Sequence, residues 1–452
     1  MTVPQAKIPF MVALPRGVLA LLAGGLLITG APTSAPAADP LTAENGFTQT
    51  PGGRGGRIVR VTNLKKSGRG SLAAALAERE RRIIVFEIAG VIDLEGASLN
   101  VREPCVTVAG QTAPAPGITL IRGGLTIATH DVILQHLRVR PGEAGHAKGS
   151  GWETDGIATV GGAYDVIVDH CSCTWATDEN LSASGPRFAG DDAAAWREGT
   201  SHRITFSNCL IAEGLSRSTH GKGEHSKGSL IHDNASDIAI FGNLYANNVE
   251  RNPLFKGGVR GVLVNNLIVN PGRRSVHFAL IADEWGTHAP ANGQLAIIGN
   301  VMRAGVDTIP QAALMVYSRG PLELHLSDNR AEARDGQPLP LYRSLASPGA
   351  GPGCTLTNQP PLWPVKLKPL PSERVREIVL TNAGAQPWAR DAIDQRIVDQ
   401  ARAGTGRVIN SESEVGGYPN LKPVRVRFVP SEWDLQTMQR RNSASRGGDQ
   451  TH

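Results

Sequence analysis

The chain has 452 residues, of which 40% are hydrophobic, 5% are aromatic and 52 are glycine. This length allows one long domain with a small extension, because a solenoid can exceed the usual domain size. The formal net charge of +5 and the sequence pI of about 9.0 favour an acidic partner. No basic run and no interleaving of basic with aromatic residues indicates nucleic-acid binding, so none is expected.

Residues 1–38 have the features of an export signal. Lys7 and Arg16 precede an apolar stretch from Val18 to Ile28, and Ala35-Pro36-Ala37 offers a small-residue cleavage site. A membrane anchor is the alternative, but the apolar stretch is too short to span a bilayer comfortably. Loss of Lys7 and Arg16 with the signal lowers the formal charge from +5 to about +3. We therefore expect a secreted or periplasmic protein without membrane association after processing.

Strand-like runs of seven residues recur along the chain. Their starting positions are separated by 34, 38, 34, 23 and 34 residues. The runs begin at Asp131, Asp165, Arg203, Asp237, Arg260 and Gln294. Repetition of this kind is typical of a solenoid in which each repeat forms one turn of a coil.

The last residue of each run forms one column if the turns stack at about 4.8 Å. The column contains Leu137, Cys171, Cys209, Asn243, Asn266 and Asn300. Three stacked asparagines can hydrogen-bond to one another through their side chains. The column therefore predicts an all-β fold, a parallel β-helix.

The five cysteines are odd in number and form no CxxC pair. Cys171 and Cys209 are neighbours in the predicted column, so an exported protein could join them by a disulfide. We favour stacked, buried thiols instead. Zinc binding is not indicated, because no second Cys/His pair has ligand spacing.

A short helix is predicted near the beginning of the mature chain. Ser71 can cap a helix that runs to about Arg81, with Leu72, Ala75 and Leu76 on one face. We interpret this helix as a cap on the open end of the coil, because unpaired strand edges must be covered.

The chain changes character after Gly305. We predict a β-helix domain over residues 39–305, a C-terminal extension of loops and helices over residues 306–441 that packs on the coil, and a disordered tail over residues 442–452. Within the extension, Pro387 to Gln400 has the apolar spacing of a helix.

Several segments together resemble the secreted pectate lyases of polysaccharide lyase family 1. The resemblance covers roughly residues 46–305, and the bacterial members' tail is similar to residues 383–398 and 414–419. The segments that carry it include GGRGGRIVRVTNLKKSGRGSLAAAL, VTVAGQTAPAPGITL, VILQHLRVRPG, DGIATVGGAYDVIVDHCSCTWATDENLS and RNPLFKGGVRGVLVNN. The resemblance implies a right-handed parallel β-helix, bound calcium and β-elimination on polygalacturonate.

The coil phase places four charged residues along one edge, in the order Asp155, Asp178, Lys227 and Arg251. Three steps of about 4.8 Å span roughly 14 Å, which is room for a few sugar units. Acids lie at one end of this groove and bases at the other. The C5 proton of a uronate becomes acidic only when the neighbouring carboxylate is neutralised, and a hard cation held by carboxylates does this.

The resemblance assigns Asp155 and Asp178 to the first two calcium positions. The third position falls on Ser182, where the family commonly has a carboxylate, so this chain departs from the pattern. Either Glu179 or the substrate's own carboxylates would have to supply the missing charge. The alternative interpretation of the two aspartates is that they cap turns or strands.

Arg251 matches the family's catalytic arginine, which is interpreted as the base. Because an unperturbed guanidinium hardly deprotonates, this role depends on the resemblance. The alternative is a surface arginine that pairs with Glu250 or another acid. Lys256 matches a second basic position, which binds a substrate carboxylate.

The family's substrate-binding lysine corresponds to either Lys222 or Lys227. The local sequence around Lys222 is more similar to the family's motif, whereas the position within the coil favours Lys227. His220 and His225 could line the groove or lie in a solvated loop. Asp169-His170 matches the family's Asp-His signature, which we interpret as structural.

The sequence therefore predicts a monomeric pectate lyase that cleaves polygalacturonate with calcium and releases unsaturated oligogalacturonides. One alternative is a lyase for methylated pectin or another uronate polymer. A second alternative is a non-catalytic β-helix that binds polysaccharide or lies at the cell surface; such a protein would keep the ladder and lose Arg251.

Overall fold

The computed structural model describes residues 41–317, 320–345 and 353–441. The predicted export signal and the predicted disordered tail lie outside these residues. Every helix within the described ranges is too short or too polar to cross a membrane.

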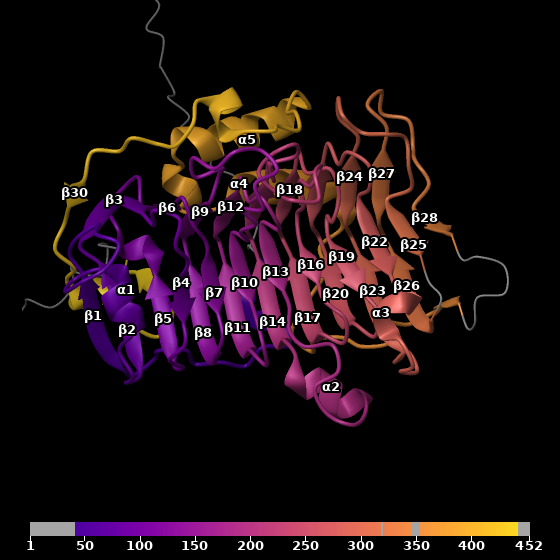
Figure 1. Ribbon diagram of the computed structural model, residues 1–452, viewed down its shortest axis with the longest axis horizontal. Helices are drawn as coiled ribbons and strands as arrows, with labels where there is room; N and C mark the ends of the chain where they lie inside the picture. Colours follow the sequence, from indigo (N-terminus) through magenta and orange to yellow (C-terminus); the bar gives the residue numbers. More distant parts are fainter. Residues whose placement is uncertain (1–40, 318–319, 346–352, 442–452) are drawn as a thin grey trace, which may run out of the picture. The chain divides into compact units, whose positions relative to one another are not determined.

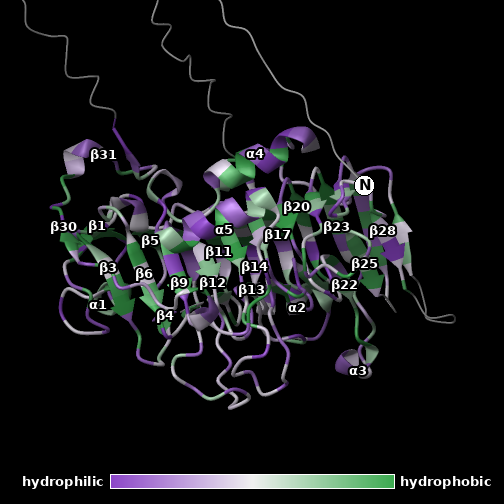
Figure 2. Ribbon diagram, turned by 90° about the horizontal axis from the view of Figure 1, so that it is seen from above, coloured by the Kyte–Doolittle hydropathy of each residue, from purple (hydrophilic) through white to green (hydrophobic). Residues whose placement is uncertain are grey.

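Short strands stack side by side into three sheets, and the chain visits one sheet after another as it winds into a right-handed parallel β-helix (Figure 1). This confirms the predicted fold. Figure 2 shows the apolar residues on the stacked strands and mainly polar residues on the loops that project from them.

Within the described residues, the first sheet has 11 strands. In stacking order they are β1 (Arg57–Val61), β2 (Arg82–Phe86), β5 (Val106–Ala109), β8 (His130–Gln135), β11 (Tyr164–Asp169), β14 (His202–Ser207), β17 (Ser236–Phe241), β20 (Arg260–Val264), β23 (Gly293–Ile298), β26 (Leu322–Ser327) and β29 (Cys354–Leu356).

The other two large sheets have 9 and 10 strands over the same described ranges. The nine-stranded sheet contains β4 (Leu99–Val101), β7 (Leu125–Ile127), β10 (Ile157–Thr159), β13 (Leu181–Ala183), β16 (Leu230–Ile231), β19 (Leu254–Lys256), β22 (Val276–Ala279), β25 (Leu314–Tyr317) and β28 (Tyr342–Ser344). The ten-stranded sheet contains β30 (Val424–Arg425), β3 (Ile88–Asp93), β6 (Ile118–Ile121), β9 (Leu137–Arg140), β12 (Ser172–Thr174), β15 (Leu210–Ala212), β18 (Leu244–Ala246), β21 (Leu267–Val269), β24 (Val301–Arg303) and β27 (Arg330–Glu332).

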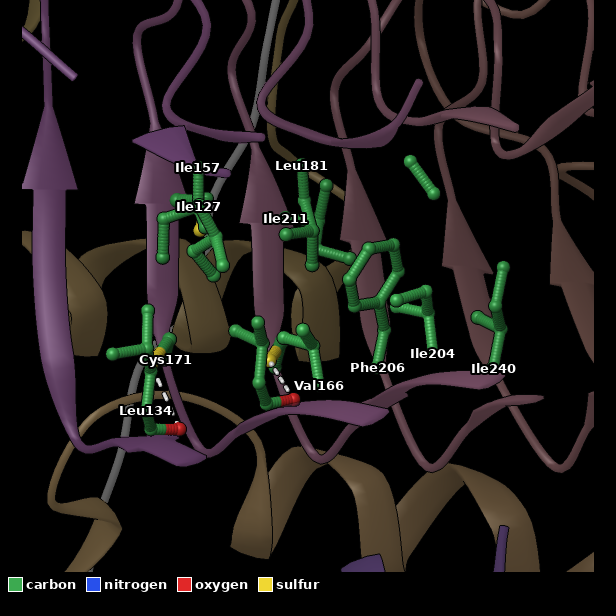
Figure 3. Close-up of a cluster of buried hydrophobic side chains, with 14 of the residues drawn as sticks. Ile127, Leu134, Ile157, Val166, Cys171, Leu181, Ile204, Phe206, Ile211 and Ile240 are labelled. Carbon is green, nitrogen blue, oxygen red and sulfur yellow. Dashed lines mark hydrogen bonds between the residues drawn. The ribbon is translucent and has the colours of Figure 1, made fainter. Parts of the chain in front are cut away.

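Apart from β30, which pairs antiparallel with β3, the strands of these three sheets pair parallel and in register with the equivalent strand of the next coil, so like residues stack. Val166 of β11 lies opposite Ile204 of β14, which lies opposite Ile238 of β17, and all three are fully buried. Figure 3 shows such side chains directed into the interior of the coil. The interior is filled by rows of β-branched and aliphatic residues because parallel strands buried on both faces favour them.

The predicted asparagine column exists and is one residue longer than expected. The side-chain amide of Asn243 donates to Asn266 at 2.9 Å, that of Asn266 to Asn300 at 2.9 Å, and that of Asn300 to Asn329 at 3.0 Å. Cys171 and the other four cysteines, all within the described residues, are free thiols. The structure therefore does not contain the alternative disulfide between Cys171 and Cys209.

The residue before this column turns the chain from the first sheet into the ten-stranded sheet. His136, His170, Asn208 and Asn265 take this position with φ of 55°, 49°, 51° and 52°. This left-handed conformation costs a side chain with a Cβ energy, and asparagine tolerates it better than most residues. Two of these four corner residues, His136 and His170, are histidines.

The capping helix α1 spans Leu72–Leu76, and the Ser71 hydroxyl accepts a hydrogen bond from the Ala74 N–H at 3.2 Å. The start of the helix is as predicted, but it ends about one turn before Arg81. The buried guanidinium of Arg82 donates to the carbonyls of Ala75 and Leu76 at 3.1 and 2.7 Å. These bonds satisfy the carbonyls at the helix end.

The coil continues past Gly305, the residue at which the sequence placed the end of the β-helix domain. Strands β25 to β29 add further coils from Leu314 to Leu356, and Leu322, Leu324 and Leu326 alternate along β26. The shorter helices α2 (Ala193–Gly199) and α3 (Ala282–Trp285) lie in loops that leave the coil.

Helices near the C-terminus pack on the outer face of the ten-stranded sheet. The predicted helix from Pro387 to Gln400 is a 3-10 turn (Pro387–Ala389) followed by α5 (Ala392–Ala403). Helix α4 (Ser372–Asn382) was not predicted. Apolar side chains of both helices form one buried cluster with strand residues: Leu210, Leu244, Leu267, Val375, Val379, Ile397 and Val398.

A buried ion-pair network attaches α5 to β9. Arg138 Nε lies 2.9 Å from Asp394 Oδ2, and Arg140 lies 2.6 Å from Asp391 Oδ2 and 2.7 Å from Asp394 Oδ1. Removing one member would leave a buried charge without its partner, which typically costs about 3–5 kcal/mol. The network therefore specifies where the extension docks.

The asparagine ladder leads to a stability prediction. Replacing Asn266 by alanine removes the acceptor of the Asn243 backbone and side-chain N–H groups, which are buried. Because a buried donor without a partner costs about 1–3 kcal/mol, we expect Asn266→Ala to lower the free energy of unfolding by roughly 2–4 kcal/mol. Urea unfolding followed by circular dichroism measures the change. The exposed control Asn100→Ala should keep the wild-type midpoint, and equal losses in both variants would contradict the ladder's role.

Candidate active site

A column of charged residues stands just before the strands of the nine-stranded sheet. Glu179, Lys227 and Glu250 pair with one another in register through isolated bridges. Asp178 directly precedes Glu179 in the sequence. Arg251 directly follows Glu250. The predicted charged edge therefore exists, but its in-register members are Glu179 and Glu250 as well as Lys227.

Three carboxylates gather at the beginning of this edge. Ligand oxygens of Asp155, Asp178 and Glu179 all lie within 4.8 Å of one another. Asp155 accepts hydrogen bonds from the Glu179 backbone N–H at 2.9 Å and from the Ser182 hydroxyl at 2.6 Å. Ser182 is fully buried, and its hydroxyl orients Asp155.

The two aspartates of this cluster differ in their electrostatics. Burial and the negative charge of Asp178 raise the pKa of Asp155 to about 7. Burial also raises the pKa of Asp178, but the hydrogen bond from His225 and the charges of the nearby histidines and Arg251 outweigh it, so this pKa is lowered. Burial and the neighbouring Asp178 both disfavour a negative charge on Asp155, and a bound cation would offset both effects.

Arg251 lies beside this cluster. Its guanidinium forms an ion pair with Glu179, and its side chain is 24% exposed. Burial lowers the pKa of Arg251, although the charges of Asp178 and Asp155 oppose the shift. The direction of this shift favours deprotonation relative to a solvated arginine. Glu250, which the alternative interpretation offered as the partner of Arg251, binds other residues.

The structure separates the two candidate lysines. Lys227 is buried and forms an ion pair with Glu250, which also lies 2.7 Å from Arg274 and 3.2 Å from Arg273. Lys222 is exposed, and its side chain forms no ion pair with any described residue. Of these two lysines, only Lys222 lines the cleft.

The histidine pair holds Asp178 in place. His220 and His225 are both buried and stack at 3.6 Å between ring centroids with an interplanar angle of 12°. His225 Nε2 lies 2.6 Å from Asp178 Oδ1, and His220 Nε2 lies 3.7 Å from the same oxygen. Neither histidine lies in a solvated loop.

These three residues also form a group that could hold a metal ion. The rings are nearly parallel, so their in-plane lone pairs are nearly parallel too and do not converge on one ion. The arrangement is better suited to hydrogen bonding with the carboxylate.

A cleft of about 300 Å³ joins these groups. It brings together Asp178, Glu179, Lys222, His225, Arg251 and Lys256 of the residues already named; the others are Arg187, Leu230, His232, Leu254, Ile281 and Glu284. Asp155 adjoins the cleft because it accepts a hydrogen bond from the Glu179 N–H, and Ser182 in turn donates to Asp155. His220 adjoins it beside Asp178. Lys227 is buried outside it.

Sequence reasoning missed the acids and the arginine at the far side of the cleft. Lys256 contacts Glu284 and lies 3.6 Å from Asp233. Arg187 lies 3.0 Å from Asp233 and 2.8 Å from Glu284. Arg187 belongs to the insertion between β13 and β14, and nothing in its local sequence indicates that the loop folds back over the cleft.

A right-handed parallel β-helix with clustered carboxylates beside an arginine and lysines in a surface cleft is the arrangement of a polysaccharide lyase. The family model described as "Pectate lyase" matches residues 17–284. "Probable pectate lyase C" of Emericella nidulans is 31% identical over 376 residues, which are 82% of this chain and 77% of the relative. The chain therefore belongs to the pectate lyase family.

Solved structures support the fold. The major cedar pollen allergen, Jun a 1, is 15% identical with a TM-score of 0.51, covering 75% of this chain and 92% of the allergen. A pectate lyase bound to a hexasaccharide is 13% identical with a TM-score of 0.50, covering 78% of this chain and 100% of that enzyme. At these identities the similarity concerns the fold alone.

The position of the two lysines leads to a second prediction. Lys222→Ala should raise KM several-fold with little change in kcat or in thermal stability, because it removes a cation from an open cleft. Lys227→Ala should lower thermal stability, because it removes a buried partner of Glu250. Steady-state kinetics and thermal unfolding of both variants measure these effects. The reverse pattern would assign substrate binding to Lys227.

Proposed function

We propose that the protein cleaves polygalacturonate by calcium-assisted β-elimination and releases unsaturated oligogalacturonides. The observation that carries the proposal is the cluster of Asp155, Asp178 and Glu179, whose oxygens lie within 4.8 Å, next to Arg251. The family and the cleft support an acidic polysaccharide as the substrate. We also propose that the protein acts outside the cytoplasm as a monomer.

The donor set of the cluster fits calcium. Ca²⁺ takes 6–8 oxygen ligands and favours carboxylates, and three carboxylates can supply a large share of them. Asp155, Asp178 and Glu179 would hold the ion, with Ser182 orienting Asp155 through its hydroxyl. When bound, calcium would neutralise a substrate carboxylate and so acidify the C5 proton. Glu179 therefore compensates for the serine at the third position.

Residues of the chain would remove the C5 proton, bind the substrate and position Asp178. Arg251 faces the cleft beside the acidic cluster, where it can remove the C5 proton; its lowered pKa supports this role. Lys222 and Lys256 also line the cleft and would bind further substrate carboxylates. His220 and His225 hold Asp178 at its position.

The alternatives are less well supported. A methylated substrate offers fewer charges to Arg187, Lys222 and Lys256, which all line the cleft. A non-catalytic β-helix would have no reason to hold Arg251 beside a carboxylate cluster in a partly buried position.

The direct test measures product absorbance. With polygalacturonate as the substrate, we expect absorbance of the unsaturated product at neutral to alkaline pH, loss of the signal in chelator, and recovery with added calcium. Activity that persists in chelator would remove the metal from the proposal. New reducing ends without the unsaturated chromophore would indicate hydrolysis.

The proposed base leads to the prediction for Arg251→Lys. Lysine keeps the positive charge but loses the planar guanidinium, so its nitrogen would be displaced from the C5 proton by about 1 Å. Such a displacement can lower kcat on the order of a hundredfold, and we expect at least this loss with KM and the circular dichroism spectrum largely unchanged. Lys256→Ala is the matched control, because a carboxylate-binding residue should mainly raise KM. A near wild-type kcat in Arg251→Lys would exclude Arg251 from the chemical step.

A further inference from the structure

A second, larger cleft lies at a different edge of the coil from the active site. It has a volume of about 730 Å³ and shares no lining residue with the active-site cleft. Its floor is the corner between the first sheet and the ten-stranded sheet, where Gln135 and Asp169 end their strands and His136 and His170 turn the chain. Its walls come from the C-terminal extension, including Trp388 and residues 426–440.

Two tryptophans line this cleft. Trp388 is 66% exposed, and its ring lies 5.0 Å from the ring of His136. Trp433 is half-buried and packs against Phe428 at 5.8 Å. An indole left open to solvent on the rim of a cleft offers a flat apolar face, and the C–H faces of sugar rings pack against such faces.

The histidines of the floor present hydrogen-bonding groups to the cleft. His170 Nδ1 bonds to Asp169 at 2.9 Å, so its Nε2 points away from the carboxylate. His136 Nδ1 accepts from the Gln386 N–H at 3.2 Å, so its proton is on Nε2. Neither Nε2 has a hydrogen-bond partner among the described residues.

The carboxylate oxygens of Asp169 already accept hydrogen bonds within the protein. Besides His170, this carboxylate accepts from the Ser207 hydroxyl at 2.8 Å and the Asn208 amide at 3.1 Å, and it is buried. Ser207 and Asn208 belong to the next coil, so Asp169 links two coils, which agrees with the structural interpretation of the Asp169-His170 pair. Both oxygens of Asp169 are therefore hydrogen-bonded within the protein, while the carboxylate keeps its negative charge at the floor of the cleft.

One cation that lines the cleft has no ion-pair partner among the described residues. Arg440 pairs with Glu432 at 2.9 Å, which balances both charges. Arg427 is exposed and forms no ion pair in the described part of the chain. A cleft with two indoles, two imidazoles and one guanidinium that forms no ion pair with a described residue combines stacking surfaces with a group that can bind a carboxylate.

We propose that this second cleft binds a uronate segment of an acidic polysaccharide without cleaving it. The cleft would hold one part of a long polymer while the active site acts on another, which raises the local concentration of cleavable segments. The choice of a uronate ligand rests on the proposed function, since the substrate of the active site is taken to be polygalacturonate. Trp388 and Trp433 would stack on sugar rings, and Arg427 would bind a carboxylate.

The test measures retention of the full-length protein in native gels that contain polygalacturonate. Chelator is present so that the polymer stays intact. Trp388→Ala should weaken retention about threefold to tenfold, Trp388→Phe less, and Arg427→Ala about twofold to fivefold. Lys366→Ala is the matched control, because Lys366 is exposed, lies outside this cleft and loses the same charge. Its retention should equal that of the wild type.

Activity assays complete the test. The cleft variants should cleave a short oligogalacturonate at the wild-type rate and lose rate only on dilute polymer. Wild-type retention in both Trp388→Ala and Arg427→Ala would overturn the proposal, even if unsaturated product forms. Equal loss of retention on a neutral galactan gel would overturn the uronate assignment.

The outcomes separate this proposal from the proposed function. Reduced retention in the cleft variants without unsaturated product from the wild type would refute the lyase mechanism and support the second cleft. Circular dichroism confirms the fold of each variant, and Arg427→Ala, at an exposed position, keeps the proposal testable if Trp388→Ala does not fold.

Discussion

Parallel stacking in register is the constraint on which the rest of this structure depends. Each residue of a coil lies next to the equivalent residue of the coils before and after it, so one column of side chains is built from residues 23 or 48 positions apart, as in Glu179, Lys227 and Glu250. A column of like charges spaced at about 4.8 Å would be destabilising. Here the signs alternate, and the buried Lys227 is neutralised by Glu250. Loops of any length can leave the coil as long as they return to the same register, which explains how the insertion that contains α2 is tolerated.

The carboxylate cluster differs from this column because it places three acidic side chains next to one another. Asp155, Asp178 and Glu179 bring three like charges together, and each has a different local partner: Ser182 for Asp155, His225 for Asp178 and Arg251 for Glu179. Burial and the charge of Asp178 nevertheless raise the pKa of Asp155 to about 7. Departures from local electrostatic balance are expected at functional sites rather than in structural columns.

Much of the fold could be predicted because it depends on repetition. The spacing of the strand-like runs and the column from Asn243 to Asn300 were sufficient to predict a parallel β-helix, and Ser71 identified the start of the capping helix. The coils after Gly305 were missed because the polar, proline-rich loops between their short strands hide the repeat. Helix α4 was missed although Val375 and Val379 have helical spacing and Pro371 precedes it.

The site was only partly predictable because sequence spacing does not report which way a side chain points. Asp155, Asp178 and Arg251 could be identified from the resemblance and the coil phase. The coil phase did not predict where the Lys227 side chain lies, since the registers of Glu250 and Leu254 with the preceding coil differ by one residue and Arg251 lies between them with φ of 62°. This irregularity turns Arg251 toward the cleft and leaves Lys227 beneath it. His225 and Arg187 depend on how two loops fold, which has no local signal.

The C-terminal extension that carries Trp388 is fixed to the coil by a buried arginine of β9. The Arg138 guanidinium binds Asp394 of α5 and donates to the Ala385 carbonyl at 2.9 Å, so one buried side chain positions both the helix and the segment that leads into Trp388. A buried ion pair contributes little net stability compared with apolar packing, but it tolerates few alternative geometries. The apolar cluster under α4 and α5 would allow the helices to slide along the sheet, whereas the charges of β9 admit one position. The wall of the second cleft is therefore set by the same register that sets the active site.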